Sequence, residues 1–488
     1  MIISGSVLGR VVRSIGAETI GQLLNVLTRL VLVPFFLKFW GAESYGEWLI
    51  ISAWCSWFTL GDLGGQLFFS NKLTSSWAKQ RLDEFHETFS TGLFLFLATS
   101  LSLLILVIVG LHFVSIHQLI KLENIGAQET SLIFFIMALR FIAAMPVGLS
   151  MAVYRAIGFQ ATSIMCTNWI LVLQFLFTIL ALSLGAGMLF IAMIELIPFL
   201  LLLLYVCFDL PRRLPNAFKL FSLGGINFKL LKKSIAPSLY FLGIQVALAI
   251  MIQGSVIVLS RILNPVAVTL FSSLRLVANV MSRFLGVLNH SVWPELTRLY
   301  EAKDEARLSE IFEYVLYLSV FFGLLYITVI IYFGELLFNW WLGGKLDYSF
   351  WAALFLSIHV VLNGIWTWGG SFLMASNLHK EYSLFQFPVS FFSLAVMYYG
   401  ATTWGLIGGV VGMFIGQFIL MSIIVYKLLV KEGFGRIAKS YLLTTLVTMV
   451  CLPLLLNKWL AMFTLLFLSF FIALKLKKII SKVIFRHV

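Results

Sequence analysis

Long apolar stretches recur along the whole of this chain, and they constrain its fold more than any other feature. Most of them reach about 18 residues or more, enough for an α-helix to cross the hydrocarbon core of a bilayer. The 488 residues are 61% hydrophobic and only 11% charged. A soluble protein of this length would lack the polar side chains to cover its surface. The sequence therefore predicts an all-α integral membrane protein.

The apolar stretches predict about fourteen transmembrane helices, of which the last two are the shortest. We expect these helices near residues 11–38, 47–71, 88–114, 131–153, 161–184, 188–207, 237–262, 266–291, 313–334, 350–375, 382–403, 405–428, 440–456 and 459–474. The first stretch is too long for the apolar core of a signal peptide and lacks a small-residue cleavage site, so we expect it to remain as a helix. Pro34, Pro146 and Pro388 fall inside predicted helices and are expected to kink them.

The positive charges of the loops predict the topology. One side of the membrane carries only Lys38, Lys121, Lys345 and Lys458, with Arg261 at its border. The other lysines and arginines of the loops and ends fall on the opposite side, which the positive-inside rule assigns to the cytoplasm. We therefore expect a multi-pass protein of the bacterial inner membrane with both termini in the cytoplasm. The net charge of +13 is then a topology signal, and no nucleic-acid partner is predicted.

The chain repeats parts of its own sequence. Residues 13–15 (Arg-Ser-Ile) correspond to residues 233–235 (Lys-Ser-Ile), before the first and seventh helices. Residues 73–84 and 296–310 share the order Leu-Thr, aromatic, Ala-Lys, Arg-Leu and Glu. Six helices separate the copies, and because that number is even, both copies have the same orientation. This predicts two six-helix lobes related by a parallel repeat, with the substrate site between them.

The repeat gives a predicted domain organisation of four parts. Residues 1–207 form an N-terminal lobe, 208–236 a cytoplasmic linker, and 237–428 a C-terminal lobe. Residues 429–488 supply two further helices and a basic cytoplasmic tail outside the repeat.

Arginines lie inside the apolar stretches, where each costs at least a few kcal/mol unless it faces a protein interior or a water-filled cavity. They are Arg29, Arg140, Arg275 and Arg283. The acids away from the ends of these stretches are fewer: Glu18, Asp62 and Glu195. A cavity lined by these residues has a positive potential and suits an anion that passes through the membrane.

Arg140 and Arg275 each lie about nine residues into a predicted helix, near the bilayer centre at 1.5 Å per residue. Guanidinium groups bind phosphate oxygens in pairs, so a substrate diphosphate is one predicted partner. The alternative is a buried ion pair with Asp62 or Glu195. Arg283 lies eight residues beyond Arg275, toward the cytoplasm. Arg29 lies nearer the outer end of its helix, where it either receives the phosphates or extends toward the interface.

Other polar and aromatic residues are candidates for coupling or sugar binding. Glu18, Asp62, Glu195 and His359 are candidates for ion coupling or gating, against structural pairing for the acids and packing for the histidine. Trp366 and Trp368 lie beside Gly364, Gly369 and Gly370 and are candidates for stacking on sugar rings, against a packing role. The cysteines have no metal or redox spacing and no phosphate-binding Walker loop is present, so no metal, cofactor or enzymatic activity is predicted.

Short motifs in a consistent order resemble the MOP superfamily of exporters, and within it the Wzx-type polysaccharide flippases. They are Trp40-Gly41, Tyr45-Gly46, Leu60-Gly61-Asp62-Leu63-Gly64, Tyr154-Arg155-Ala156, Val292-Trp293-Pro294-Glu295-Leu296, Arg298-Leu299-Tyr300 and Trp340-Trp341-Leu342-Gly343-Gly344. The resemblance covers the first twelve helices. It implies a two-lobe transporter that moves an undecaprenyl-diphosphate-linked oligosaccharide from the inner to the outer leaflet by alternating access, with membrane lipids and other polysaccharide-assembly proteins as partners.

Several alternatives remain open. A MATE-type multidrug or cation antiporter shares the plan, although an excess of buried arginine opposes a cationic substrate. A flippase for a lipid-linked peptidoglycan precursor fits the charges equally well. Major-facilitator transporters usually carry a glycine-rich, charged loop that residues 72–87 lack, and a glycosyltransferase or polymerase would need clustered acids or a large outer loop.

Overall fold

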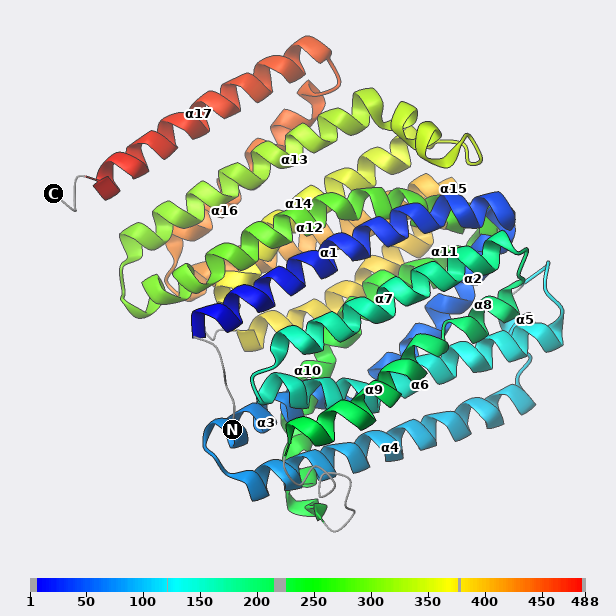
Figure 1. Cartoon of the computed structure of the whole chain (residues 1–488). Helices are drawn as coiled ribbons and strands as arrows, with labels where there is room; N and C mark the ends of the chain where they lie inside the picture. Colours follow the sequence, from blue (N-terminus) through cyan, green and yellow to red (C-terminus); the bar gives the residue numbers. More distant parts are fainter. Residues whose placement is uncertain (1–6, 121, 215–224, 376–378, 485–488) are drawn as a thin grey trace. The chain divides into compact units, whose positions relative to one another are not determined.

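The computed structural model describes residues 7–120, 122–214, 225–375 and 379–484 (Figure 1). All regular elements in these residues are helical, which confirms the all-α prediction. Contacts divide the chain into two compact units, Met1–Val266 and Ala267–Val488. Lys121, part of the predicted linker (215–224) and the end of the predicted basic tail (485–488) lie outside the described residues.

The described residues of unit 1 form thirteen helical elements, and three of its transmembrane helices are each divided into two or three of these elements. They are α1 (Val7–Phe39), α2 (Gly41–Ser56), the 3₁₀ segment η1 (Trp57–Asp62), α3 (Gly65–Ala78), α4 (Leu82–Phe113), α5 (Ile116–Ile120), α6 (Ala127–Ala156), α7 (Gln160–Ser183), α8 (Met188–Ile194), α9 (Ile197–Arg213), α10 (Phe228–Ala249), the π-helical segment η4 (Ile250–Gly254) and α11 (Ser255–Ile262).

Unit 2 contains longer helices. They are α12 (Pro265–Glu301, whose first two residues belong to unit 1), α13 (Glu305–Leu342), α14 (Phe350–Ala375), α15 (His379–Lys431), α16 (Gly435–Leu454) and α17 (Lys458–Ile484). Trp404 and Gly405 have non-helical backbone angles inside α15, which is therefore two helices joined by a sharp turn.

The helices have the length and composition of a multi-pass membrane protein. In the described residues, 11 helices are long and apolar enough to cross a membrane. That number treats α15 as one span, although it contains both predicted helices 382–403 and 405–428. The predicted helix 47–71 falls on α2, η1 and α3, and the predicted helix 459–474 falls on α17. The prediction of about fourteen transmembrane helices is confirmed.

The contacts place the seventh transmembrane helix in unit 1. Its segments α10, η4 and α11 pack along α3, η1 and α2. The chain just after α11 also lies close to α2, because a Cβ atom at Gly46 would collide with the backbone carbonyl of Pro265, the first residue of α12. The division into units rests on contacts between residues, whereas the predicted lobes rest on a repeat in the sequence. The two need not coincide, so the predicted linker at 208–236 stays a prediction.

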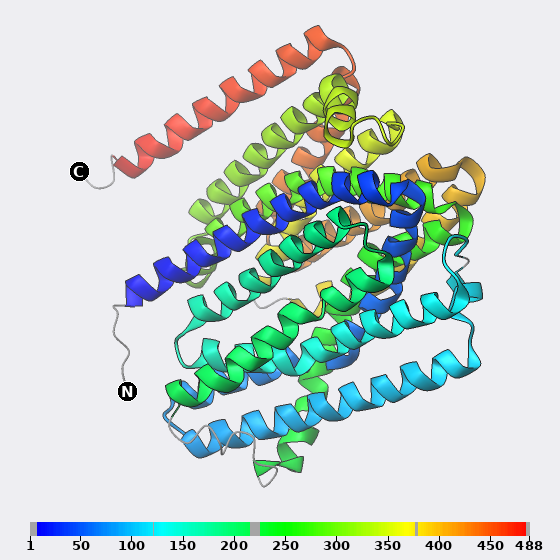
Figure 2. The same ribbon diagram turned by 45° about the vertical axis from the view of Figure 1, so that its right-hand side comes forward.

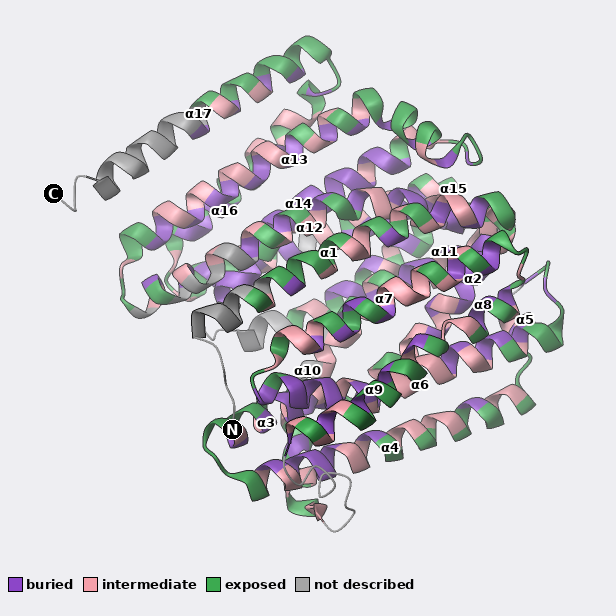
Figure 3. Ribbon diagram, in the orientation of Figure 1, coloured by how far each residue is buried: buried purple, intermediate pink, exposed green. Residues whose placement is uncertain are grey.

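Large apolar side chains form the core of unit 1 between α3, α4 and α6. Phe69, Phe85, Phe89 and Leu149 are fully buried there. Leu101 and Leu106 of α4, by contrast, are 59% and 62% exposed, and green exposed residues run along that helix in Figure 3. Apolar side chains on the outside are expected where the solvent is lipid.

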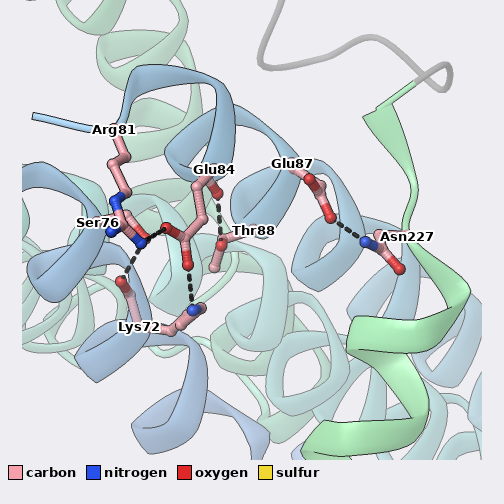
Figure 4. A network of polar contacts seen from close by, with 7 residues as sticks. All are labelled: Lys72, Ser76, Arg81, Glu84, Glu87, Thr88 and Asn227. Carbon is pink, nitrogen blue, oxygen red and sulfur yellow. Dashed lines mark hydrogen bonds and ion pairs between the residues drawn. The ribbon is translucent and has the colours of Figure 1, made fainter.

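Polar contacts join the ends of α3, α4 and α10 (Figure 4). Glu84 is paired with Lys72 and lies 3.5 Å from Arg81. Asn227, which caps α10, donates to Glu87 from its side chain and to Thr91 from its backbone at 2.9 Å. These contacts connect the start of the seventh transmembrane helix to the second and third.

The two halves of α15 pack through small residues. Cβ atoms at Gly400 or Gly408 would collide with the backbone carbonyl of the other residue. A Cβ atom at Gly416 would lie 2.7 Å from Cα of Ser393 and 2.9 Å from its hydroxyl. Glycines at intervals of four residues allow two membrane helices to approach until their backbones touch.

Candidate functional site

Helix α1 carries three different faces. Glu18, Gln22 and Arg29 are exposed, and with Asn25 they recur every three or four residues, so they form one polar stripe. Gln22 donates a hydrogen bond to Glu18 at 3.0 Å. The structure thus places two predicted site residues, Glu18 and Arg29, on the same stripe.

The second face of α1 packs against α7, which lies beside it in Figures 1 and 2. Asn168 of α7 donates to the carbonyl of Ala17 at 3.0 Å, and a Cβ atom at Gly21 would collide with the Asn168 side chain. Thr28, about two turns beyond Gly21, is also buried.

The third face of α1 is apolar. Ile20, Leu23 and Leu27 are 50%, 59% and 57% exposed. At 100° per residue they lie on roughly the opposite side of the helix from the polar stripe. An exposed apolar face fits contact with lipid, and the polar stripe therefore belongs to the side that is accessible to water.

The sixth transmembrane helix is broken beside Glu195. Helix α8 ends at Ile194 and α9 begins at Ile197. Pro198 has no N–H to donate to the preceding turn, and the N–H of Phe199 bonds to Leu196 instead of Glu195. The side chain of Gln174 on α7 donates to the Glu195 carbonyl at 3.3 Å. A side chain thus replaces the lost backbone hydrogen bond, as a break inside a membrane requires.

At this break Glu195 forms an ion pair with Arg140 of α6. Nη1 of Arg140 donates to Oε2 of Glu195, and the two side chains are 22% and 15% exposed. The guanidinium carbon lies 5.3 Å and 5.9 Å from the ring centroids of Phe141 and Phe199. Of the two partners considered for Arg140, the structure shows Glu195 and not Asp62.

Asp62 stabilises a second break, in the second transmembrane helix. Its Oδ1 accepts from the backbone N–H of Gly64 at 2.9 Å. The backbone of Gln66 and the side chain of Gln245 from α10 also lie close to this carboxylate. Leu63 and Gly64 adopt left-handed angles, φ 51° and 72°, which interrupt the helix before α3. In this state the Asp62 carboxylate accepts from the N–H of Gly64, the N-cap residue of α3, which is a structural role.

Unit 2 holds the other candidate residues. Arg275 and Arg283 on α12 are both half-buried, and the Arg275 guanidinium lies 4.9 Å from the ring centroid of Phe271. Arg275 is ten residues from the start of α12 at Pro265, which corresponds to about 15 Å along the helix. Their predicted role in substrate binding stays a prediction.

The aromatic candidates are buried in unit 2. Trp366 is 3% and Trp368 0% exposed. Their indole N–H groups donate at 2.9 Å to Ser422 and Ser319. His359 is buried, and its Nδ1 has no hydrogen-bond partner among the described residues. Both tryptophans act as packing residues in this state, and no face of either is presented to a sugar.

Sequence reasoning missed Gln174 and Gln245, the two amides that support the helix breaks. Both are uncharged residues in apolar helices, and only the positions of neighbouring helices give them a function. A search of the described residues finds no group of three or more His, Cys, Asp or Glu side chains that could hold a metal ion.

Solved structures with the same arrangement of helices are transporters. A multidrug-resistance MATE family transporter of the MOP superfamily, in an inward-facing conformation, has a TM-score of 0.73 at 12% identity, covering 87% of this chain and 99% of its own. The lipid II flippase MurJ, in an inward closed conformation, has a TM-score of 0.65 at 15% identity, covering 97% and 100%. No protein-family model and no curated protein sequence matches the chain. The chain therefore has the fold of the transporters of the MOP superfamily.

Proposed function

We propose that this protein is a flippase that moves an undecaprenyl-diphosphate-linked oligosaccharide across the bacterial inner membrane by alternating access, for surface polysaccharide assembly. The observation that carries the proposal is that four arginines, Arg29, Arg140, Arg275 and Arg283, lie well inside the membrane-spanning helices. Acids lie in these helices as well: besides Glu18, Asp62 and Glu195, Glu47 is fully buried in α2. Asp62 and Glu47 both accept hydrogen bonds from backbone N–H groups, so neither acid needs an arginine as its partner.

The positions of two arginines support an anionic substrate. Arg29 lies on the exposed polar stripe of α1, opposite the apolar face. Arg140 keeps 22% of its side chain exposed despite its pair with Glu195. A diphosphate offers oxygen edges that match the guanidinium fork. The charged head group would follow these residues while the polyprenyl tail stays in lipid, which avoids moving a charge through hydrocarbon.

The second candidate is a flippase for a lipid-linked peptidoglycan precursor. The lipid II flippase MurJ shares the fold over 97% of this chain, and a lipid diphosphate would meet the same arginines. A MATE-type multidrug antiporter is the third reading, and the four arginines oppose its usual cationic substrates.

Transport into the interior of vesicles tests the proposal. Purified protein is reconstituted with a fluorescent undecaprenyl-diphosphate oligosaccharide, and a membrane-impermeant quencher reports the label that has crossed. We expect crossing to depend on the protein and to fail in Arg275→Ala. Crossing of lipid II alone would favour the second candidate, and accumulation of a cationic dye without lipid crossing would refute the flippase. Collapse of proton and sodium gradients tests the predicted coupling.

A further inference from the structure

The ion pair between Arg140 and Glu195 raises a question for any anionic substrate that uses Arg140. The guanidinium donates to a carboxylate of the protein itself, so a diphosphate must compete with that carboxylate. Both side chains are largely buried, 22% and 15% exposed. A carboxylate that loses its partner in such a place is strongly disfavoured as an anion.

The surroundings of Glu195 offer no second cation. Helix α6 contributes Arg140, and α7 contributes the uncharged Gln174, which bonds to the Glu195 backbone and not to its carboxylate. The nearby titratable group on α2 is the thiol of Cys55, which bonds to the carbonyl of Phe134 at 3.5 Å and is exposed to the charge of Arg140. When Arg140 binds another anion, no other cation among the described residues can take its place beside Glu195. Protonation is then the remaining way to neutralise the Glu195 carboxylate.

We propose that Glu195 is the resident counter-anion of Arg140, which the substrate diphosphate displaces, and that Glu195 takes up a proton when it is displaced. This inference rests on the proposed function and adds the linkage between substrate and proton. A substrate oxygen replaces the Glu195 oxygen on the guanidinium, and the proton comes from water. Substrate binding and protonation of Glu195 then favour each other. Each of them breaks the ion pair between Arg140 and Glu195, which competes with the other event.

The location of the pair makes this exchange possible. Glu195 lies at the break between α8 and α9, where the backbone is held by a side chain and not by regular helical hydrogen bonds. A carboxylate in a continuous helix would be tied to that helix. At the break, a small change in the angle between α8 and α9 moves the carboxylate away from Arg140 while Gln174 keeps the break satisfied.

The test measures binding of farnesyl diphosphate to the full-length protein in nanodiscs, with farnesol as the uncharged comparator. Wild type should bind the diphosphate more weakly as the pH rises. Glu195→Gln, which mimics the displaced, protonated carboxyl, should bind about tenfold more tightly at high pH, a usual size for coupling between two sites. Calorimetry in buffers of different ionisation enthalpy should show about one more proton taken up by wild type than by Glu195→Gln.

Three controls separate the possible failures. Glu43→Gln, an exposed acid of the same unit, should behave as wild type. Glu195→Asp keeps the charge and should keep the pH dependence, which provides a second reading if the Gln variant fails to fold. Arg140→Gln combined with Glu195→Gln should lose the gain in affinity.

Two results would overturn the proposal in different ways. If wild type binds the diphosphate over farnesol but Glu195→Gln matches it in affinity and proton uptake, the displacement is wrong and the proposed function stands. If no variant distinguishes the diphosphate from farnesol, the anionic substrate itself is wrong, and the displacement falls with it.

Discussion

Substitution of Gly416 by alanine tests the contact between the two halves of α15. The added Cβ atom would lie 2.7 Å from Cα of Ser393, whereas carbon atoms in contact lie about 3.5 Å apart or more. The helices would have to separate by roughly 0.8 Å, and the obstacle is backbone, which cannot rotate away. Overpacking usually costs about 1–3 kcal/mol, and we expect a value near 3 kcal/mol because the whole pair must shift.

The assay is denaturant unfolding of the purified protein in detergent, followed by tryptophan fluorescence, to which the buried Trp366 and Trp368 contribute. Gly286→Ala is the matched control, because Gly286 lies in α12 with no atom within 4 Å of an added Cβ. It should be neutral or stabilising by up to about 1 kcal/mol, the difference in helix propensity. Equal free energies of unfolding for Gly416→Ala and wild type would refute the close approach, as would an equal loss in Gly286→Ala.

Three further predictions concern charge and packing within the units. Arg140→Ala should destabilise unit 1 by about 3–5 kcal/mol because Glu195 is left buried without its partner, and Glu195→Ala in the same background should recover much of that loss in the same unfolding assay. Arg275→Ala should abolish export of the lipid-linked oligosaccharide from cells while the protein remains in the membrane, and Arg275→Lys should restore part of it; full export by the alanine variant would remove Arg275 from the mechanism. Asn168→Leu should separate α1 from α7 and lower the melting temperature, whereas Gly158→Ala, at a loop glycine with φ +89°, should be costly through backbone strain alone; an unchanged melting temperature in Asn168→Leu would show that the hydrogen bond from Asn168 to Ala17 has no role.

The positions of the transmembrane helices could be predicted because hydropathy depends on composition over a long window. All fourteen predicted ranges fall on described helices. The interruptions could not be predicted, because they depend on single hydrogen bonds. The helix continues through Pro34, Pro146 and Pro388. The second transmembrane helix, by contrast, breaks at residues 57–64, which contain no proline.

The candidate site was predictable in residue type but not in pairing. An arginine within an apolar stretch is unusual because its charge is costly to place in a membrane. Arg140 and Arg275 could therefore be selected from the sequence. Which acid meets Arg140 depends on the packing of α6 against α8, and that proximity is set by the whole unit. The role of Trp366 and Trp368 could not be predicted, because a tryptophan that stacks on a sugar and a tryptophan that packs in the core look the same in a sequence.

The three faces of α1 limit how that helix can move. A rotation about its own axis by half a turn would bring Glu18 and Arg29 into lipid, at about 2.5–3.5 kcal/mol for each charge near the bilayer centre. The same rotation would remove Gly21 from its contact with Asn168. Bending exposes neither charge, and Pro34 provides a site where the helix lacks one backbone hydrogen bond. We therefore expect that α1 does not rotate about its own axis but can bend near its outer end. Its polar stripe would then face the same direction throughout a transport cycle.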